Sequence, residues 1–155
     1  MADVTPLDFP GIRDALISHA QRIGRFNDVT KHEPVNKPNG VHAALWVDKV
    51  TPLGSASGLA TVTVRLACIC RIYLNAASQP YDELDAKGLA AADRLMAAWA
   101  GDFTLGGRIR DVDIKGAHGV PLDGQAGYQD IGDTKFRVFT IVVPLIINDV
   151  WEEVA

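Results

Sequence analysis

Residues 60–74 read ATVTVRLACICRIYL, and this stretch determines the fold class. Its even-numbered positions carry only apolar or cysteine side chains, whereas its odd-numbered positions mix threonine, arginine, alanine, isoleucine and tyrosine. Successive side chains of a strand point to opposite faces of a sheet. The two-residue period therefore predicts one long strand with an apolar face and a mixed face.

Helical patterns stand on either side of this strand. Apolar side chains within residues 8–24 recur at spacings of four, four and three, and Gly24 supplies a stop. Residues 82–100 begin with acidic side chains, continue with apolar side chains at helical spacing and end before Gly101. We expect two helices, with Gly88 as a weak point of the second that costs about 1 kcal/mol relative to alanine.

Shorter segments complete the predicted sheet. Alternating residues predict strands, and clusters of glycine, proline and asparagine predict loops. The expected strands are residues 41–51, 108–115 and the hairpin arms 126–129 and 134–147, with a candidate strand within 25–32; the expected loops are 33–40, 54–58 and 116–127. Helices kept apart from hairpin-linked strands indicate an α+β fold, a mostly antiparallel sheet with two helices packed on one face, in a single domain over residues 1–155.

The last expected strand is apolar on both faces between residues 139 and 147. Two small helices can cover only one face of a sheet. Either the chain's own long hairpins cover the other face or a neighbouring subunit does, and the sequence leaves both interpretations open. Pro144 cannot donate to a ladder, so it predicts a bulge or an edge in this strand.

Composition and charge exclude several classes of protein. The chain has 155 residues, 48% of them hydrophobic, which suits one globular domain. Its formal net charge of -4 leaves no broad basic surface, so a DNA-binding domain is disfavoured. The longest strongly apolar run, residues 141–147, is too short to span a bilayer, and the first six residues lack the features of a secretion signal.

The sequence carries no signature of catalysis, metal binding or cofactor binding. Cys68 and Cys70 lack partners at zinc-ligand spacing and are interpreted as packing residues in a reducing compartment such as the cytoplasm. Asp111 and Asp113 share a strand face that is equally a solvated face, and the glycines of residues 101–107 follow a helix instead of preceding one. The histidines stand alone in helix and loops, at His19, His32, His42 and His118. We therefore expect no enzyme, no cofactor and no metal.

Three parts of the chain carry a family resemblance. They are AGDFTLGGRIRDVD at residues 100–113, FRVFTIVVPL at residues 136–145, and the opening helix with the Glu-Pro loop and ALWV at residues 44–47 that follow it. These phrases resemble tail terminator proteins of long-tailed, siphovirus-type bacteriophages, particularly those that infect actinobacteria. The resemblance covers nearly the whole chain. It lies in the order of the expected elements and in short stretches of sequence, and it assigns no single residue to a functional site.

The resemblance implies a structural virion protein of the tail neck, assembled in the host cytoplasm. Such a subunit forms a homo-oligomeric ring, a hexamer, that caps the completed tail tube, stops its polymerisation and offers a surface to the head-side connector or head-completion protein. DNA passes through the lumen without specific binding, and an acidic subunit suits this passage because a basic lining would hold phosphates. The alternatives are another phage neck or completion protein, and a small cytoplasmic ligand-binding domain or enzyme.

Interface residues are expected on two loops, on the mixed face of the long strand and near the end of the chain. The loops at residues 53–59 and 116–127 are rich in glycine, so we expect them to be mobile in the free subunit and protected on assembly. The expected interface residues are Gly54, Ser55, Ser57, Arg65, Arg71, Tyr73, Gly119, Asp123, Gln125 and Trp151.

Overall fold

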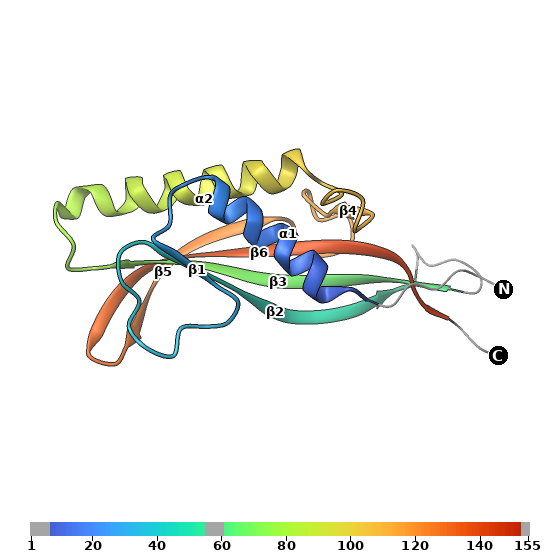
Figure 1. Ribbon diagram of the computed structural model, residues 1–155, viewed down its shortest axis with the longest axis horizontal. Coiled ribbons are helices and arrows are strands. Elements are labelled where there is room, and N and C mark those ends of the chain that lie inside the picture. Colours follow the sequence, from blue (N-terminus) through green and yellow to red (C-terminus); the bar gives the residue numbers. More distant parts are fainter. Residues whose placement is uncertain (1–6, 55–60, 153–155) are drawn as a thin grey trace.

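One six-stranded sheet forms the frame of the computed structural model, which describes residues 7–54 and 61–152 (Figure 1). Along the chain the elements are α1 (Phe9–Arg22), β1 (Asp28–Thr30), β2 (His42–Leu53), β3 (Thr61–Asn75), a single 3₁₀ turn (Tyr81–Glu83), α2 (Leu84–Gly101), β4 (Asp111–Val112), β5 (Asp123–Ile131) and β6 (Thr134–Glu152). The strand order is β1-β2-β3-β6-β4, and β5 also pairs with β6. β1 runs parallel to β2, whereas all the other pairs are antiparallel, so the expected α+β fold is confirmed.

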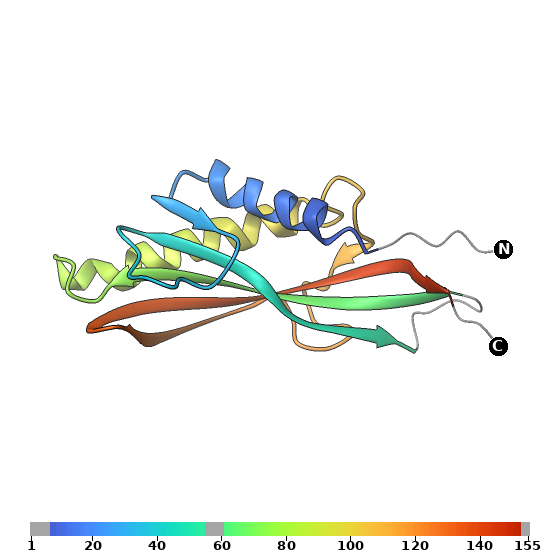
Figure 2. The same ribbon diagram turned by 60° about the horizontal axis from the view of Figure 1, so that its bottom comes forward.

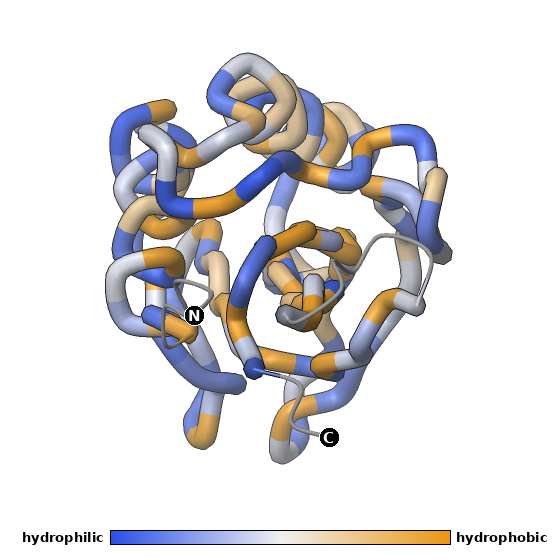
Figure 3. The backbone as a smooth tube through the Cα atoms, turned by 90° about the vertical axis from the view of Figure 1, so that its right-hand side faces the viewer, coloured by the Kyte–Doolittle hydropathy of each residue, from blue (hydrophilic) through white to orange (hydrophobic). Residues whose placement is uncertain are grey.

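Both helices lie on the same face of the sheet (Figure 2). Seen along the long axis, the sheet curls beneath them (Figure 3). The core between the layers includes the fully buried Trp99, Leu16 and Leu66. Polar contacts add to the packing between the helices, because the Trp99 indole donates to the Leu16 carbonyl at 3.3 Å and His19 Nε2 lies 2.8 Å from Oδ2 of Asp102, which follows α2. None of the helices in the described residues combines the length and apolarity needed to cross a membrane.

Gly88 marks a close approach of α2 to the sheet. A Cβ atom built at this glycine would lie 2.0 Å from Cε2 of Phe139 on β6, closer than carbon atoms can pack. Both residues are buried. The description of Gly88 as a weak point of the helix is therefore incomplete, since the missing side chain lets α2 rest directly on the Phe139 ring.

Several expected boundaries are wrong, and one of them is the end of the last strand, since β6 runs to Glu152 instead of residue 147. The strand expected over residues 108–115 is reduced to the two residues of β4. Turns occupy the preceding segment because three successive residues adopt positive φ angles, namely Leu105, Gly106 and Gly107. The loop expected over residues 116–127 ends earlier, since β5 begins at Asp123 and pairs with β6 without a shift in register.

Pro144 lies within the continuous strand β6 and causes no bulge. β5 pairs with β6 as far as Val142 and β4 pairs with it from Leu145, so Pro144 falls in the gap between these two partners. Its carbonyl oxygen faces this gap and accepts a bond from the amide of Asp113 at 2.9 Å. Because the nitrogen and oxygen of one strand residue point to the same side, the missing N–H of Pro144 costs no ladder bond.

Candidate functional site

The sheet face opposite the helices, here called the outer face, carries the mixed side chains that the sequence predicts for β3. Residues paired across strands share a face, so Arg65, Ile69, Arg71 and Tyr73 of β3 lie on it with their partners on β2 and β6. The chain covers the two ends of this face with its own segments. Its centre stays partly exposed and is the candidate functional site.

Asp113 fixes the loop of residues 113–122 over one end of the outer face (Figure 2). Its buried carboxylate accepts bonds from the amides of Ala117 at 2.7 Å and His118 at 3.0 Å. Arg65 lies against it, with Nε 3.5 Å from Asp113 Oδ2, and donates through Nη2 to the carbonyl of Val120. Only 12% of the Arg65 side chain is exposed, so this ion pair joins the loop to the sheet where water is largely excluded.

Apolar residues of the outer face are buried at this end. Ile146, the partner of Arg65 on β6, is 0% exposed, and Ala67 next to it on the same face is 7% exposed. The sequence left open whether the chain itself or a neighbouring subunit covers this face. At this end of the sheet the chain's own loop covers it.

Aromatic side chains close the other end of the outer face. Tyr73 and Phe136 are buried there with ring centroids 6.3 Å apart, and the His42 ring lies 6.1 Å from that of Tyr73. The segment of residues 31–41 leads into this cluster. Its Lys37 Nζ lies 2.7 Å from Asp133 Oδ1 in the β5–β6 turn, which ties the segment to the tip of the hairpin.

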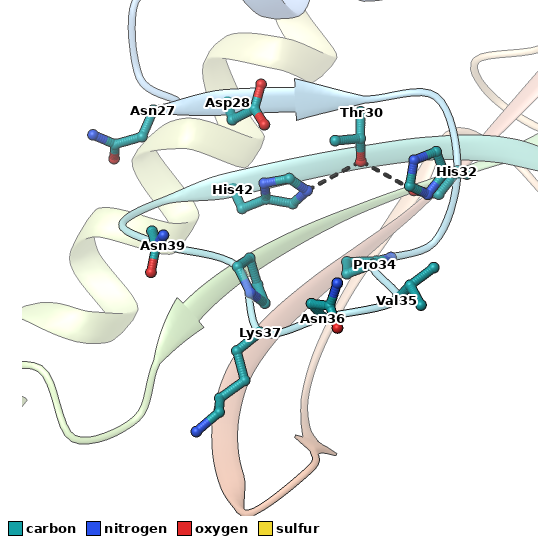
Figure 4. A pocket seen from close by; sticks show the side chains of 11 residues that line it. Asn27, Asp28, Thr30, His32, Pro34, Val35, Asn36, Lys37, Asn39 and His42 are labelled. Carbon is teal, nitrogen blue, oxygen red and sulfur yellow. Dashed lines mark hydrogen bonds between the residues drawn. The ribbon is translucent and has the colours of Figure 1, made fainter.

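A polar pocket lies between this segment, β1 and the start of β2 (Figure 4). The Thr30 hydroxyl donates to the carbonyl of His32 at 3.0 Å, so its oxygen accepts from His42 Nε2, 3.1 Å away. This places a proton on Nε2 of His42. Burial lowers the pKa of His42, although the negative charge of Asp28 acts to raise it. Among the described residues no three His, Cys, Asp or Glu side chains gather where they could hold a metal ion.

The centre of the outer face forms what we call the open band. Its members come from four strands and are all at least partly exposed: Trp46, Ile69, Arg71, Gln125, Thr140 and Val142. Three of them make an apolar row, since Trp46 lies opposite Ile69 and Ile69 lies opposite Val142. The row thus crosses β2, β3 and β6 between the two covered ends.

Arg71 is held in a fixed position beside this row. Its Nε donates to Thr140 Oγ1 at 2.9 Å and its Nη1 donates to Gln129 Oε1 at 2.8 Å. The guanidinium carbon also lies 5.4 Å from the centroid of the Trp46 ring. An oriented arginine next to a half-exposed tryptophan is typical of the residues that dominate protein–protein binding.

The structure brings together some of the sequence-predicted interface residues and separates others. Arg71 and Gln125 belong to the open band, whereas Arg65 and Gly119 are engaged in the contact between loop and sheet. Tyr73 is 0% exposed, so its ring is not on the surface of this subunit. Asp123 is exposed and pairs with Val142, so it lies at the margin of the open band. The remaining positions lie apart: Gly54 directly after β2, Trp151 near the end of the ladder between β6 and β3, and Ser55 and Ser57 outside the described residues.

Four members of the open band, among them Thr140, were not predicted from the sequence. Trp46, Ile69 and Val142 come from distant parts of the chain and become neighbours only through the register of β2, β3 and β6. The alternation within each strand was a usable signal for the face, but it could not align one strand with the next.

The two cysteines lie in the core, on the helix-covered face of β3. Cys68 is 0% and Cys70 is 1% exposed, and neither forms a disulfide. Burial raises the pKa of each thiol to about 12, which keeps both protonated. Their interpretation as packing residues is confirmed.

Comparison with known proteins finds similarity among solved structures. No family model and no curated protein matches the chain. One of the similar structures is the sheath/tube terminator of an extracellular contractile injection system, PVC, in its extended state. It is 10% identical with a TM-score of 0.48, and the alignment covers 98% of this chain and 62% of that one. The chain thus spans less than two thirds of the length of the terminator that it matches.

Proposed function

We propose that the chain is a tail terminator subunit of a long-tailed bacteriophage. Copies of it form a ring, a hexamer in the resembling family, that sits on the end of the tail tube, stops its polymerisation and offers a surface to the head-side connector. The ring acts in the neck of the virion without catalysis, and DNA passes through its lumen. The sequence phrases at residues 100–113 and 136–145 are the starting point of this proposal.

The open band is the structural observation that carries the proposal. Its apolar row crosses three strands between the two covered ends of the outer face. Partly exposed apolar side chains beside a fixed arginine are typical of a place where another protein binds. A protein that works only by contact, as a terminator does, needs such a surface and needs no catalytic group.

Inactivating the gene in its phage tests the proposed function. An uncapped tube end stays competent to add subunits, so we expect tails of irregular, excessive length and heads that lack tails. Expression of the intact protein in the host should restore tails of uniform length. Normal tails joined to heads without the protein would exclude a terminator, and normal-length tails without heads would favour another neck protein.

A variant separates the open band from other surfaces. Ile69→Gln puts a polar group in the middle of the apolar row, and we expect it to fold but to restore uniform tails poorly. Val35→Gln is the matched control, because Val35 is 82% exposed in the pocket segment away from the row. Equal rescue by both variants would remove the open band from the proposal.

A further inference from the structure

The sheet has two open edges, and only one of them is protected. On β2, residues 46–52 extend beyond the short pairing with β1, but the bulge between Val47 and Lys49, Lys49 itself and Pro52 hinder a strand from adding there. Within the described residues β5 pairs only with β6, so the side of Asp123–Ile131 away from β6 is the second edge. We call this side the β5 edge.

The β5 edge lacks the devices that normally keep sheet edges from pairing. Its nine residues, DGQAGYQDI, include no proline, lysine or arginine, and its ladder with β6 has no bulge. A regular edge of this length is a template on which another strand can add.

The backbone groups that β5 offers to this edge follow from the geometry of β6. The carbonyls of Pro144 and Ile146 accept bonds from the β4 side, so the even-numbered residues of β6 direct their N–H and C=O groups away from β3. β5 lies on that same side of β6 and places its odd-numbered residues opposite the even-numbered residues of β6. The odd-numbered residues of β5 therefore bond to β6. The residues whose backbone groups point to the free edge are all exposed: Gly124, Ala126, Tyr128 and Asp130.

These groups fit a second copy of the same strand. Two copies of β5 that run antiparallel about a two-fold axis at Gly127 place even-numbered residues opposite even-numbered residues, so the free backbone groups of both copies meet. In this register Tyr128 of one copy lies opposite Ala126 of the other. Asp130 lies opposite Gly124 of the other copy. Large side chains thus face small ones across the seam.

Charge is compatible with the antiparallel pair and opposes a parallel one. In the antiparallel pair Asp123 lies opposite Ile131 of the other copy, and Asp130 lies opposite a glycine, so no two carboxylates are direct cross-strand neighbours. Asp133 in the turn is already paired with Lys37 of its own copy. A parallel pair in register would instead place each aspartate beside its own counterpart.

An apolar flank of α2 beside the same edge is an independent observation. Met96 packs on β5, since a Cβ atom built at Gly124 would lie 3.4 Å from its sulfur atom. Leu89 stands two helical turns before Met96, on the same side of α2, and its side chain is largely exposed. The even-numbered residues of β5 face the helices, so the two-fold pair carries both helix layers on one face of the shared sheet. The exposed Leu89 and Tyr128 side chains of both copies then gather along the seam.

We infer that two copies of the unassembled protein pair antiparallel through their β5 edges and share one continuous sheet. The occupant of the β5 edge is thus a second copy of this chain. A two-fold contact closes with two copies and cannot by itself build a cyclic ring of six. This inference therefore goes beyond the proposed ring and does not rest on it.

Amide hydrogen exchange over a dilution series tests the contact residue by residue. The amides of the odd-numbered β5 residues are bonded to β6 in both forms, whereas those of the even-numbered residues gain a partner only in the dimer. We expect the even-numbered amides to exchange about tenfold or more slowly at high protein concentration than at low concentration. Amides of the exposed segment 35–37 are the reference and should not change. Edge amides whose exchange is independent of concentration would overturn the inference.

Two proline variants separate the two sides of β5. Ala126→Pro removes an N–H that points to the free edge, so the circular dichroism should stay that of the wild type. The two-fold axis repeats the lost bond, and we expect the dissociation constant of the dimer to rise about tenfold or more in sedimentation velocity. Gln125→Pro removes a bond to β6 and should lower the stability of the subunit itself. Ala126→Ser keeps the amide and should dimerise as the wild type does, whereas unchanged affinity in folded Ala126→Pro would refute the pairing.

A surface variant tests the seam without touching the backbone of β5. Leu89→Glu adds a negative charge to the α2 flank of both copies, and we expect it to weaken the dimer. Val35→Glu adds the same charge at an exposed site away from the seam and is the matched control. Equal dimer affinity in these two variants would contradict the predicted position of the flank.

The remaining outcomes separate this contact from other occupants and from the proposed function. Edge amides that become protected only on assembled tails, with no dimer in solution, would assign the β5 edge to a strand of another protein and overturn the pairing of two copies. Normal tails joined to heads without the protein would exclude the terminator and leave a measured dimer standing.

Discussion

At Gly88 the absence of one carbon atom sets the distance between α2 and β6. Gly88→Ala brings a Cβ within 2.0 Å of the Phe139 ring, and such overpacking costs about 1–3 kcal/mol. The gain in helix propensity is smaller, about 1 kcal/mol or less. We expect a net fall in the free energy of unfolding, measured by urea titration.

Gly101 provides the control for this substitution. It also lies in α2, but a Cβ atom there would meet nothing within 4 Å. Gly101→Ala should leave stability unchanged or raise it by up to about 1 kcal/mol. If Gly88→Ala behaved in the same way, the Phe139 ring would have to move freely, and the close approach would carry no cost.

His42 gives the protein a defined response to acid. Burial lowers its pKa below 6.5, so between that folded value and 6.5 the unfolded chain binds the extra proton. Stability from neutral His42 is therefore complete above about pH 7 and is lost as the pH falls below about 6.5. His42→Gln keeps a donor for Thr30 without titrating, and its stability relative to wild type should rise as the pH is lowered. Parallel curves between pH 7 and 5 would contradict this.

Cys68 and Cys70 respond at the opposite end of the pH scale. Their pKa values of about 12 in the folded chain lie above the ordinary value of 9.0, so the unfolded chain loses thiol protons first. Their contribution to stability is complete below about pH 9 and is lost as the pH rises toward 12. At pH 8 we expect neither thiol to react with a disulfide reagent until urea unfolds the protein. Rapid labelling of the native protein would show that the core opens at β3.

At the scale of elements, the Asp113 carboxylate joins the loop of residues 113–122 to Arg65 of the sheet. Asp113→Asn leaves the Arg65 charge without its partner in a site where that side chain is 12% exposed. Removing one member of a buried pair costs about 3–5 kcal/mol, and the partial exposure of Arg65 reduces this to about 1–3 kcal/mol. Hydrogen exchange of the Ala117 and His118 amides should become faster because the loop opens locally. In β3 away from Arg65, exchange should change only as far as the free energy of global unfolding changes.

That loop also revises a mobility expectation. Residues 116–127 were expected to be mobile because they are rich in glycine, but β5 takes the last five of them and Asp113 bonds to two amides of the remainder. The mobility of the loop of residues 113–122 in the free subunit stays a prediction. Amide exchange near Gly119 would measure it. Residues 53–59 lie mostly outside the described residues.

The elements show which sequence signals suffice and which do not. The period of residues 60–74 and the spacing in residues 8–24 depend on many side chains, so β3 and α1 were predictable within two residues. β4 was overestimated because the chain is still in turns as far as residue 110 and turns again after Val112, although residues 108–115 alternate. Tyr73 shares a face with Arg71, but alternation could not show that the rings of Phe136 on β6 and His42 on β2 lie against Tyr73 and that it is buried.

For the whole molecule, both helices and the central strands share one core. We therefore expect urea to unfold the chain in a single transition, with far-ultraviolet circular dichroism and tryptophan fluorescence giving the same midpoint. Trp99 in the core and Trp46 on the outer face lie in different layers, so fluorescence samples both. Separate midpoints would mean that the outer-face cluster around Tyr73 melts independently.

The long ladder between β3 and β6 has a mechanical consequence. β6 has 19 residues, a length of about 60 Å, and β3 accompanies it over most of that distance. A pull along these strands loads many hydrogen bonds at once in shear, whereas a pull across them peels the bonds apart one at a time. The subunit is thus stiff along its strands and weak across them. An assembly under tension would hold best with its strands aligned to the load, and would tear first at the seams between sheet edges.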